Sequence, residues 1–507
     1  MKKMIFYMLV ALVLGMTACY EDNTTLGKDF IPDIAISALR DTTIVSYSGN
    51  VLEITPQLVT EYGEDELAYT WYMKDDRFND IEKIGGEKTL SYEVNLPSGT
   101  YTIMLQVTAL DYDYSRWASM KLSTNTAFSE GYYVLKETAD GRSELDLATA
   151  AGLNEDLMTA RFGAPLEGAP YNLTVTYGQS YINEENALIY SCKAVNVFTE
   201  KSMHIFRAED LVQVLDPSTI FYGGEPQEGE RLYSIGQVGT AMWLFTNKGV
   251  YSTGAGGFST GKYGLPKGTC ASKQAQVIAL GTSRGVAYWN EAERLLYWAD
   301  AWGDTQPWSY ELPEGMEAAT VACVASGTNY LGGVETVWFL LRDAAGNSYL
   351  VKPTDTESKC DIVEVAPASR FAKAEVMAGN TRSAAAIYFV SDNCLWAYRL
   401  DGGGEYEVPL PGVEGTITYI HNPFITLGKR YNGEPIDFNS LVVVTETGEG
   451  YNLYVYDKDN LVGGVPQRAV EPFKGSGKVK AVRYLHRERL DAYDMAFVDY
   501  TVMPWTD

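Results

Sequence analysis

The stretch AIYFVSDNCLWAYRLDGGGEY, from Ala386 to Tyr406, decides how the C-terminal part of the chain folds. It holds two apolar runs rich in β-branched and aromatic residues, separated by a Ser-Asp-Asn triplet and followed by one aspartate and three glycines. Aspartate, asparagine and glycine are the residues that tight turns need. The pattern therefore predicts a β-hairpin with a turn at each end.

Six further stretches repeat this order of apolar run, turn and second apolar run: Tyr132–Leu147, Leu188–Phe206, Met242–Tyr251, Val286–Ala299, Val337–Lys352 and Leu441–Tyr456. The copies begin 44 to 56 residues apart, which suits a four-stranded unit. A strand-only repeat of this length is typical of a β-propeller, because blades around an axis bury one another's faces. The alternative is a set of unrelated hairpins in two sandwiches.

We expect residues 128–507 to form one closed, seven-bladed propeller. An unpaired terminal blade would expose a sheet edge, so the two ends of this region should meet. We expect the late apolar strand Met495–Tyr500 to complete a blade that begins near Tyr132–Leu135.

The composition agrees with an all-β protein of more than one domain. The chain has 507 residues, of which 46% are apolar and 12% aromatic, and no long stretch reads as an amphipathic helix. The formal net charge of −26, without a basic stripe, argues against a nucleic-acid partner. Six cysteines without a CxxC pair and three scattered histidines predict no metal site.

The first residues, MKKMIFYMLVALVLGMTAC, combine two lysines, a short apolar run and small residues before Cys19. This pattern predicts an export signal over residues 1–18, too short to span a membrane. The ending resembles a bacterial lipobox, although it carries Met16 where leucine is usual. Residues 19–30 read as a tether. Glu21 and Asp22 resemble the signal that sends Bacteroidetes lipoproteins to the outer face of the outer membrane.

Residues 31–125 show short alternating runs between glycine, proline and aspartate turns, the pattern of an immunoglobulin-like sandwich. Trp71 lies in the middle of LAYTWYMK, and Leu96-Pro97-Ser98-Gly99-Thr100-Tyr101 leads into the next run. These motifs resemble the PKD family, which implies structural roles for Trp71 in the core and Tyr101 at a corner. The chain lacks that family's Asp-Phe-Gly-Asp-Gly motif, so PKD-like is the fitting term.

The order of lipobox, PKD-like sandwich and β-repeats resembles the PKD-like lipoproteins of Bacteroidetes that accompany SusC/SusD-type uptake systems. The resemblance implies an outer-membrane lipoprotein, facing the cell exterior, that binds or presents a nutrient glycan or oligopeptide to the transporter. Two alternatives stay open: a surface propeller enzyme, such as a glycosidase or lyase, and a scaffold of the transporter complex that binds no nutrient.

No catalytic constellation with suitable spacing is found, so we expect a protein that is not an enzyme, without a cofactor. Gly281-Thr282-Ser283-Arg284-Gly285 matches GxSxG, but the residues after it alternate like a strand rather than forming the required helix. Asp457-Lys458-Asp459-Asn460 begins like a calcium loop but lacks the remaining ligands, and a turn at a hairpin exit fits it better.

The densest aromatic signal is WADAWGDTQPW, which begins at Trp298 and contains Trp302, Asp304 and Trp308. Propeller blades are packed by aromatic residues, which explains Trp298 well. The glycine, proline and aspartates around Trp302 and Trp308 predict an exposed loop instead. We therefore expect these four residues to form a ligand-binding platform at one mouth of the propeller, for a neutral glycan or a neutral-to-basic peptide.

Overall fold

In the computed structural model the chain divides into two compact units, which we describe separately: one formed mainly by residues up to 123, and one formed mainly by residues from 124 onward. The residues described are 31–46, 49–75, 81–96, 99–183, 187–238, 241–254, 259–269, 278–279, 286–300, 303–308, 316–331, 334–353, 360–378, 380–381, 385–427, 436–448, 450–462, 465–486 and 497–498.

The N-terminal unit is a β-sandwich. Its main sheet has the strand order β2-β9-β8-β5-β6, and β3 pairs with β7 and β1 with β4. The strands are β1 (Ala35–Ser37), β2 (Thr42–Val45), β3 (Val51–Ile54), β4 (Gln57–Val59), β5 (Leu67–Asp75), β6 (Ile81–Gly85), β7 (Leu90–Glu93), β8 (Gly99–Ala109) and β9 (Tyr114–Asn125), with a 3₁₀ turn at Glu64–Glu66.

Alternation of side chains along β5 and β8 builds the core of the sandwich. Trp71 is fully buried, and its indole Nε1 donates a 2.9 Å hydrogen bond to the carbonyl oxygen of Glu87. Tyr101 at the start of β8 is 2% exposed. Both side chains thus lie in the interior, as a structural role requires, and neither is available to a ligand.

The second unit contains seven sheets, counted over the described residues, and they follow one another in chain order. Their strands are β39 (Lys478–Leu485), β10 (Gly131–Glu137), β11 (Ser143–Thr149) and β12 (Gly152–Asn154) in the first sheet; β13 (Pro170–Ile182), β14 (Ile189–Thr199), β15 (Met203–Arg207) and β16 (Gln213–Leu215) in the second; β17 (Leu232–Val238), β18 (Ala241–Thr246) and β19 (Val250–Ser252) in the third; and β20 (Ile278–Ala279), β21 (Val286–Asn290), β22 (Leu295–Ala299) and β23 (Thr305–Trp308) in the fourth.

The remaining three sheets complete the unit, and two of them contain more than four strands. The fifth contains β24 (Ala322–Leu331), β25 (Val334–Arg342), β26 (Ser348–Pro353), β27 (Cys360–Val365) and the short β29 (Asn380–Thr381); the sixth β28 (Val376–Met377), β30 (Ala386–Ser391), β31 (Cys394–Arg399) and β32 (Glu405–Glu407); and the seventh β33 (Thr416–His421), β34 (Phe424–Leu427), β35 (Ile436–Thr447), β36 (Gly450–Val462), β37 (Val465–Arg468), β38 (Phe473–Gly475) and β40 (Phe497–Val498). Two short α-helices, α2 (Leu157–Phe162) and α4 (Arg370–Lys373), and a 3₁₀ turn at Ala318–Thr320 lie between strands.

The hairpin predicted from Ala386–Tyr406 is formed by β30 and β31. Ser391 lies opposite Cys394, which leaves Asp392 and Asn393 as a two-residue turn. Both turn residues have positive φ, 52° and 58°, as a type I′ turn requires. The local sequence thus fixes the register of this hairpin.

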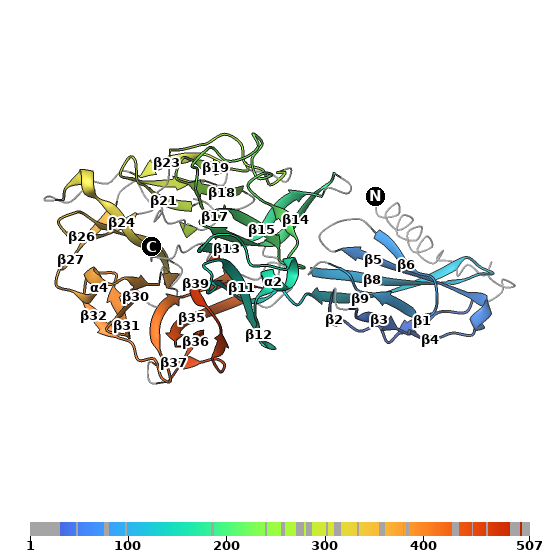
Figure 1. Cartoon of the computed structure of the whole chain (residues 1–507). Coiled ribbons are helices and arrows are strands. Elements are labelled where there is room, and N and C mark those ends of the chain that lie inside the picture. Colours follow the sequence, from blue (N-terminus) through green and yellow to red (C-terminus); the bar gives the residue numbers. More distant parts are fainter. Residues whose placement is uncertain are drawn as a thin grey trace, which may run out of the picture. The chain divides into compact units, whose positions relative to one another are not determined.

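Shared hydrophobic clusters show that the seven sheets form a closed ring, which is the propeller architecture. Each sheet packs on the next, and the seventh packs on the first, as the teal and red strands in Figure 1 also show. Buried residues of neighbouring sheets that belong to the same cluster include Leu147 and Leu173, Ile205 and Leu244, Trp243 and Trp289, Trp289 and Phe339, Leu350 and Phe389, Tyr388 and Val443, and Val444 and Val134. The number of blades in the complete chain stays a prediction.

The ring closes through a different strand from the one that the sequence predicted. β39 pairs antiparallel with β10 and supplies the missing strand of the first sheet. The later strand β40 pairs instead with β34 in the seventh sheet. The expectation for Met495–Tyr500 is therefore wrong, because the apolar residues of the earlier strand Lys478–Leu485 already fill this position.

A buried ion cluster reinforces the closure. The ammonium of Lys136, on β10, is 1% exposed and lies 2.8 Å from an Asp146 carboxylate oxygen and 2.9 Å from one of Asp156. The other carboxylate oxygen of Asp146 accepts a 2.7 Å hydrogen bond from the Tyr451 hydroxyl of β36. Burial lowers the pKa of Lys136, but the two carboxylates outweigh it, so the net shift is upward. The cluster therefore ties the first sheet to the seventh.

Candidate functional site

The structure changes the interpretation of the aromatic stretch that begins at Trp298. Trp308 is 4% exposed and lies in β23, opposite Leu296 of β22, rather than in a loop. Its ring lies 6.4 Å from that of the half-buried Trp298. The expectation that Trp308 is exposed is therefore wrong, because strand pairing turns the side chain into the core between the third, fourth and fifth sheets.

The other two residues of that predicted platform do not complete it. Asp304 is exposed, and its backbone N–H donates a 3.0 Å hydrogen bond to the Asp300 side chain, which shapes the turn between β22 and β23. Trp302 lies outside the described residues. The described part of this stretch thus offers an acidic turn beside the buried Trp308 and the half-buried Trp298, and its role in ligand binding stays a prediction.

The described parts of the remaining sequence motifs form no metal site. Residues 281–285, the GxSxG match, lie outside the described residues. Asp457 and Lys458 lie within β36, so the expected exit turn is a continuing strand. In the part of the chain that is described, no group of three or more His, Cys, Asp or Glu is placed to hold a metal ion. Burial raises the pKa of the Cys360 thiol to about 12, which keeps it protonated.

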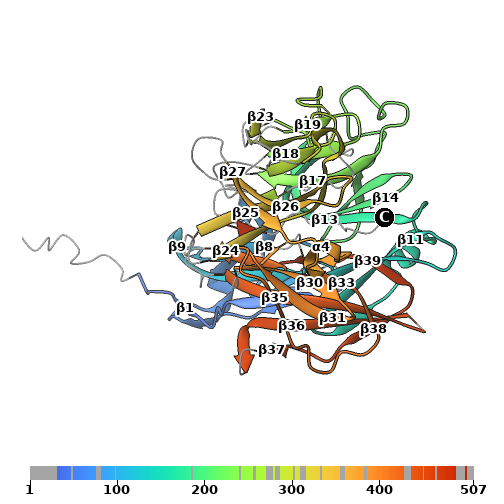
Figure 2. The same ribbon diagram turned by 90° about the vertical axis from the view of Figure 1, so that its left-hand side faces the viewer.

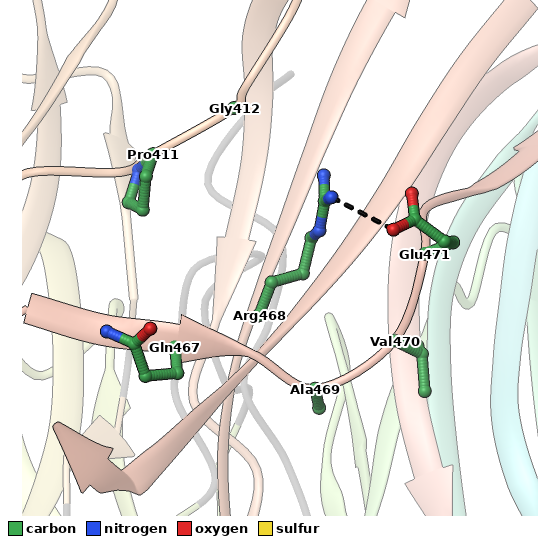
Figure 3. Close-up of a pocket in the computed structure, with 7 residues that line it drawn as sticks. All are labelled: Pro411, Gly412, Gln467, Arg468, Ala469, Val470 and Glu471. Atoms are coloured by element: carbon green, nitrogen blue, oxygen red, sulfur yellow. Dashed lines mark hydrogen bonds and ion pairs between the residues drawn. The ribbon is translucent and has the colours of Figure 1, made fainter. Parts of the chain in front are cut away.

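A pocket of about 570 Å³ lies beside β37, between the loop at Pro411 and Gly412 and residues 467–471 (Figure 3). Its charged groups are Arg468 and Glu471, which form a 3.1 Å ion pair with each other. Figure 3 shows this pair facing each other across one side of the pocket. Because the two charges already satisfy one another, the pocket offers a ligand little beyond backbone and aliphatic surface.

A better candidate lies on the sandwich unit, where two aromatic rings stack at the surface. Trp117 of β9 is 55% exposed, and its ring centroid lies 5.5 Å from that of Tyr72 on β5, with 28° between the ring planes. Two stacked rings, one of them this exposed, offer a flat apolar surface on which a ligand can stack. We call Tyr72 and Trp117 the aromatic platform.

A row of polar groups runs beside the aromatic platform across three strands. The Gln106 side chain donates a 3.0 Å hydrogen bond to the Ser115 hydroxyl, which in turn lies 2.7 Å from the Thr108 hydroxyl. The Tyr72 hydroxyl reaches the Gln106 amide oxygen at 3.4 Å. This network fixes the orientation of amide and hydroxyl groups next to a flat apolar surface.

An ion pair lies near the start of the same strand, β9, but on its other face. Tyr114 and Arg116 both hydrogen-bond the Asp33 carboxylate, at 2.7 and 2.9 Å, and these bonds lower the pKa of that carboxyl. The Arg116 guanidinium also lies 5.3 Å from the centre of the Tyr114 ring. Because Tyr114 and Arg116 have the parity of the buried Met120, this charged group lies on the opposite face of β9 from Trp117 and takes no part in the platform.

The sequence contains one signal for the platform, which is the position of Trp117 within its strand. Met120 and Leu122 of β9 are buried, so positions of the other parity point outward, and Trp117 is one of them. A tryptophan at an outward position of a strand is the unusual observation.

Comparisons with known proteins found similar solved structures and one family model. Similar solved structures include a quinonprotein alcohol dehydrogenase-like protein from Bacteroides thetaiotaomicron (16% identity, 88% of this chain and 96% of that one, TM-score 0.34), dihydro-heme d1 dehydrogenase NirN (10%, 75% and 73%, 0.36) and the WD40 domain of SCAP from fission yeast (10%, 57% and 64%, 0.33). We base the propeller assignment on the ring of sheets described above. None of the curated proteins matches the sequence.

A family model gives the more specific result. The model of the PKD-like family matches residues 19–170, a range that begins at Cys19 and covers the whole sandwich together with the first strands of the propeller unit. In the described residues, helices long and apolar enough to cross a membrane are absent. The chain therefore carries an N-terminal PKD-like domain followed by a β-propeller.

Proposed function

We propose that the protein is a lipoprotein of the outer cell surface that binds a nutrient glycan for a SusC/SusD-type outer-membrane transporter. The observation that carries the binding role is the exposed, stacked aromatic platform beside oriented amide and hydroxyl groups. Apolar faces of sugar rings stack on aromatic rings, while sugar hydroxyls need donors and acceptors of this kind. An oligopeptide is the alternative ligand.

The size of the platform sets the expected affinity. One aromatic contact contributes on the order of 1 kcal/mol, so a single platform binds one sugar ring only weakly. A polymeric glycan that engages many anchored copies at once gains affinity through effective concentration. The formal net charge of −26 disfavours acidic polysaccharides, so a neutral glycan is the better ligand.

Affinity electrophoresis of the purified protein in gels containing neutral polysaccharides tests the ligand. Trp117→Ala should abolish retardation, because it removes the exposed ring while leaving the buried face of the sheet intact. Tyr112→Ala is the matched control, since Tyr112 is an exposed aromatic of the same unit, 42% accessible, outside the platform. Equal retardation of both variants would refute the site, and release of shorter sugars would indicate an enzyme instead.

The surface location has its own support. The lipobox-like ending before Cys19 and the acidic residues after it predict an anchored, exported protein, and the PKD-like match starts at the same cysteine. A Cys19→Ala variant should leave the membrane fraction, and protease added to intact cells should remove the wild-type protein. Protection of the protein in intact cells would contradict a location facing the medium.

The transporter partnership rests on the resemblance to PKD-like lipoproteins that accompany such systems. Affinity purification of the tagged protein from detergent-solubilised membranes should recover a SusC/SusD-type pair in stoichiometric amount. Recovery without that pair, from membranes in which the transporter is expressed, would contradict the partnership while leaving the glycan site untouched.

A further inference from the structure

The first strands of the seven sheets surround the middle of the propeller. These inner strands are β39, β13, β17, β20, β24, β28 and β33. Neighbours in this order are in contact around the ring, except that β24 meets the sixth sheet through the short β29, which pairs with β24 and contacts β30. Figure 1 places β13, β17, β24 and β39 toward the middle, and the last strands β12, β23, β27 and β32 at the periphery, whereas Figure 2 shows the same unit from the side.

The inner strands carry buried polar groups with unused hydrogen-bonding capacity. Among the described residues, buried side-chain atoms without a partner occur on Gln179 of β13, Ser234 of β17, Ser326 of β24, Thr418 of β33 and Arg483 of β39. Asn422, directly after β33, also has an unpartnered amide oxygen. Polar atoms buried in this way are costly unless water or a ligand satisfies them. Their common position makes the middle of the ring a polar interior.

Arg483 stands out because it carries a full charge. Its side chain is 1% exposed, and it is one of the largest fully buried side chains in the described residues. Only Nη1 is engaged: it donates 2.7 Å hydrogen bonds to the Tyr419 hydroxyl of β33 and to the Val482 carbonyl oxygen. Nε and Nη2 have no partner among the described residues.

The contacts of Nη1 locate the guanidinium. β10 pairs with one edge of β39. The Tyr419 hydroxyl of β33 donates a hydrogen bond to the Val482 carbonyl oxygen, so it must approach β39 from the opposite edge. That opposite edge faces the middle of the ring. The guanidinium therefore spans from the first sheet to the seventh along the inner edge of β39, and its free nitrogens belong to the polar interior.

The two nitrogens without a partner among the described residues, Nε and Nη2, are arranged to bind an anion that has two oxygens. Nε and Nη2 form one side of the planar guanidinium, and their N–H groups point in parallel at the spacing of two carboxylate oxygens. Burying a guanidinium with this side unsatisfied is expensive, and no ion pair of the described residues compensates it. A bidentate anion on this side would provide both the missing charge and the two missing hydrogen bonds.

We propose that Arg483 is the centre of a carboxylate-binding site in the middle of the propeller. The ligand is a small molecule or chain end that bears a carboxylate, held side-on by Nε and Nη2. Tyr419 is a positioning residue, because its hydroxyl holds Nη1 and so fixes the plane of the guanidinium. The strongly negative chain repels large polyanions, so the site favours a ligand with one or two carboxylates. This site is independent of the aromatic platform.

Isothermal titration of the full-length protein with sodium acetate, sodium succinate and sodium phosphate, at constant ionic strength set with sodium chloride, tests the proposal. Wild-type protein should bind acetate or succinate at one saturable site, with phosphate weaker. Arg483→Gln should weaken carboxylate binding by at least about tenfold, as expected when a bidentate charge-assisted pair is lost. Tyr419→Phe should weaken it by a smaller factor.

The controls separate this site from general effects of salt. Arg399→Gln removes an exposed arginine that is paired with Asp401 at 2.8 Å, and it should leave the titration unchanged. Circular dichroism establishes that each variant is folded, and the wild-type titration remains decisive if Arg483→Gln does not fold. Absence of saturable carboxylate binding to the wild-type protein, equal binding by Arg483→Gln, or tighter binding of phosphate than of either carboxylate would overturn the proposal.

Discussion

Replacing Lys136 by methionine should destabilise the propeller more than most single substitutions do. The change removes the buried cation but leaves Asp146, whose side chain is fully buried, without its 2.8 Å partner. Burial already raises the pKa of that carboxyl, so its ionised form depends on the neighbouring ammonium. Removing one member of a buried ion pair costs about 3–5 kcal/mol.

The size of the propeller converts this cost into a melting temperature. At about 2.1 cal/(mol·K) of unfolding entropy per residue, a unit of roughly 380 residues has an unfolding entropy of about 0.8 kcal/(mol·K). The Lys136→Met variant should therefore melt about 4–6 °C lower in differential scanning calorimetry. The transition of the sandwich unit should not move, since the cluster lies wholly in the propeller unit.

Two further variants test whether burial of the charges is the cause of this loss of stability. Lys136→Met combined with Asp146→Leu removes both charges and should recover most of the loss, because an apolar pair of similar volume avoids an uncompensated charge. Lys201→Met removes the cation of an exposed 3.1 Å pair with Glu167 and should shift the melting temperature by about 1 °C or less. If Lys136→Met behaves like Lys201→Met, the cluster does not hold the ring closed.

Trp308→Ala should lower stability by about 3–5 kcal/mol in urea unfolding, the cost of a buried tryptophan; a loss below about 1 kcal/mol would restore the exposed-loop interpretation. Burial raises the pKa of the Glu209 carboxyl above its usual 4.5, so its contribution to stability is greatest below that pH and is lost as the pH rises through the folded-state value. Glu209→Gln should therefore stabilise the protein more at pH 7 than at pH 4, and unfolding curves with equal effects at both pH values would contradict this. Gly261→Ala should reduce the yield of folded protein, because a Cβ there would lie 1.8 Å from the Ser180 carbonyl oxygen; a normal yield and melting temperature would show that the loop relocates easily.

Local sequence was sufficient for features that depend on neighbouring residues. The type I′ turn at Asp392 and Asn393 could be predicted because those residue types tolerate positive φ. The interior position of Trp71 was implied by the resemblance of the motif around it to the PKD family. The all-β class and the propeller followed from repetition of such local patterns, which needs no knowledge of which strands pair at long range.

The features that the sequence did not reveal depend on pairing between distant residues. The glycine and proline near Trp308 look like a loop, yet β23 is the last strand of its sheet, where a proline costs no ladder hydrogen bond. Both Lys478–Leu485 and the later run around Phe497 have apolar residues fit for closure, and only the three-dimensional pairing distinguishes them. The unsatisfied side of Arg483 becomes visible only after Tyr419, from another sheet, has engaged Nη1.

The pairing of β39 with β10 also determines when the protein can finish folding during its synthesis. Gly131 lies opposite Leu485, so the edge of β10 has no partner until roughly 350 further residues have been made. At about 5–20 residues per second, the ribosome needs on the order of 20–70 s for that length. Throughout this interval a strand with unpaired N–H and C=O groups is open to other chains, which makes β10 the segment where a holding chaperone has most to protect.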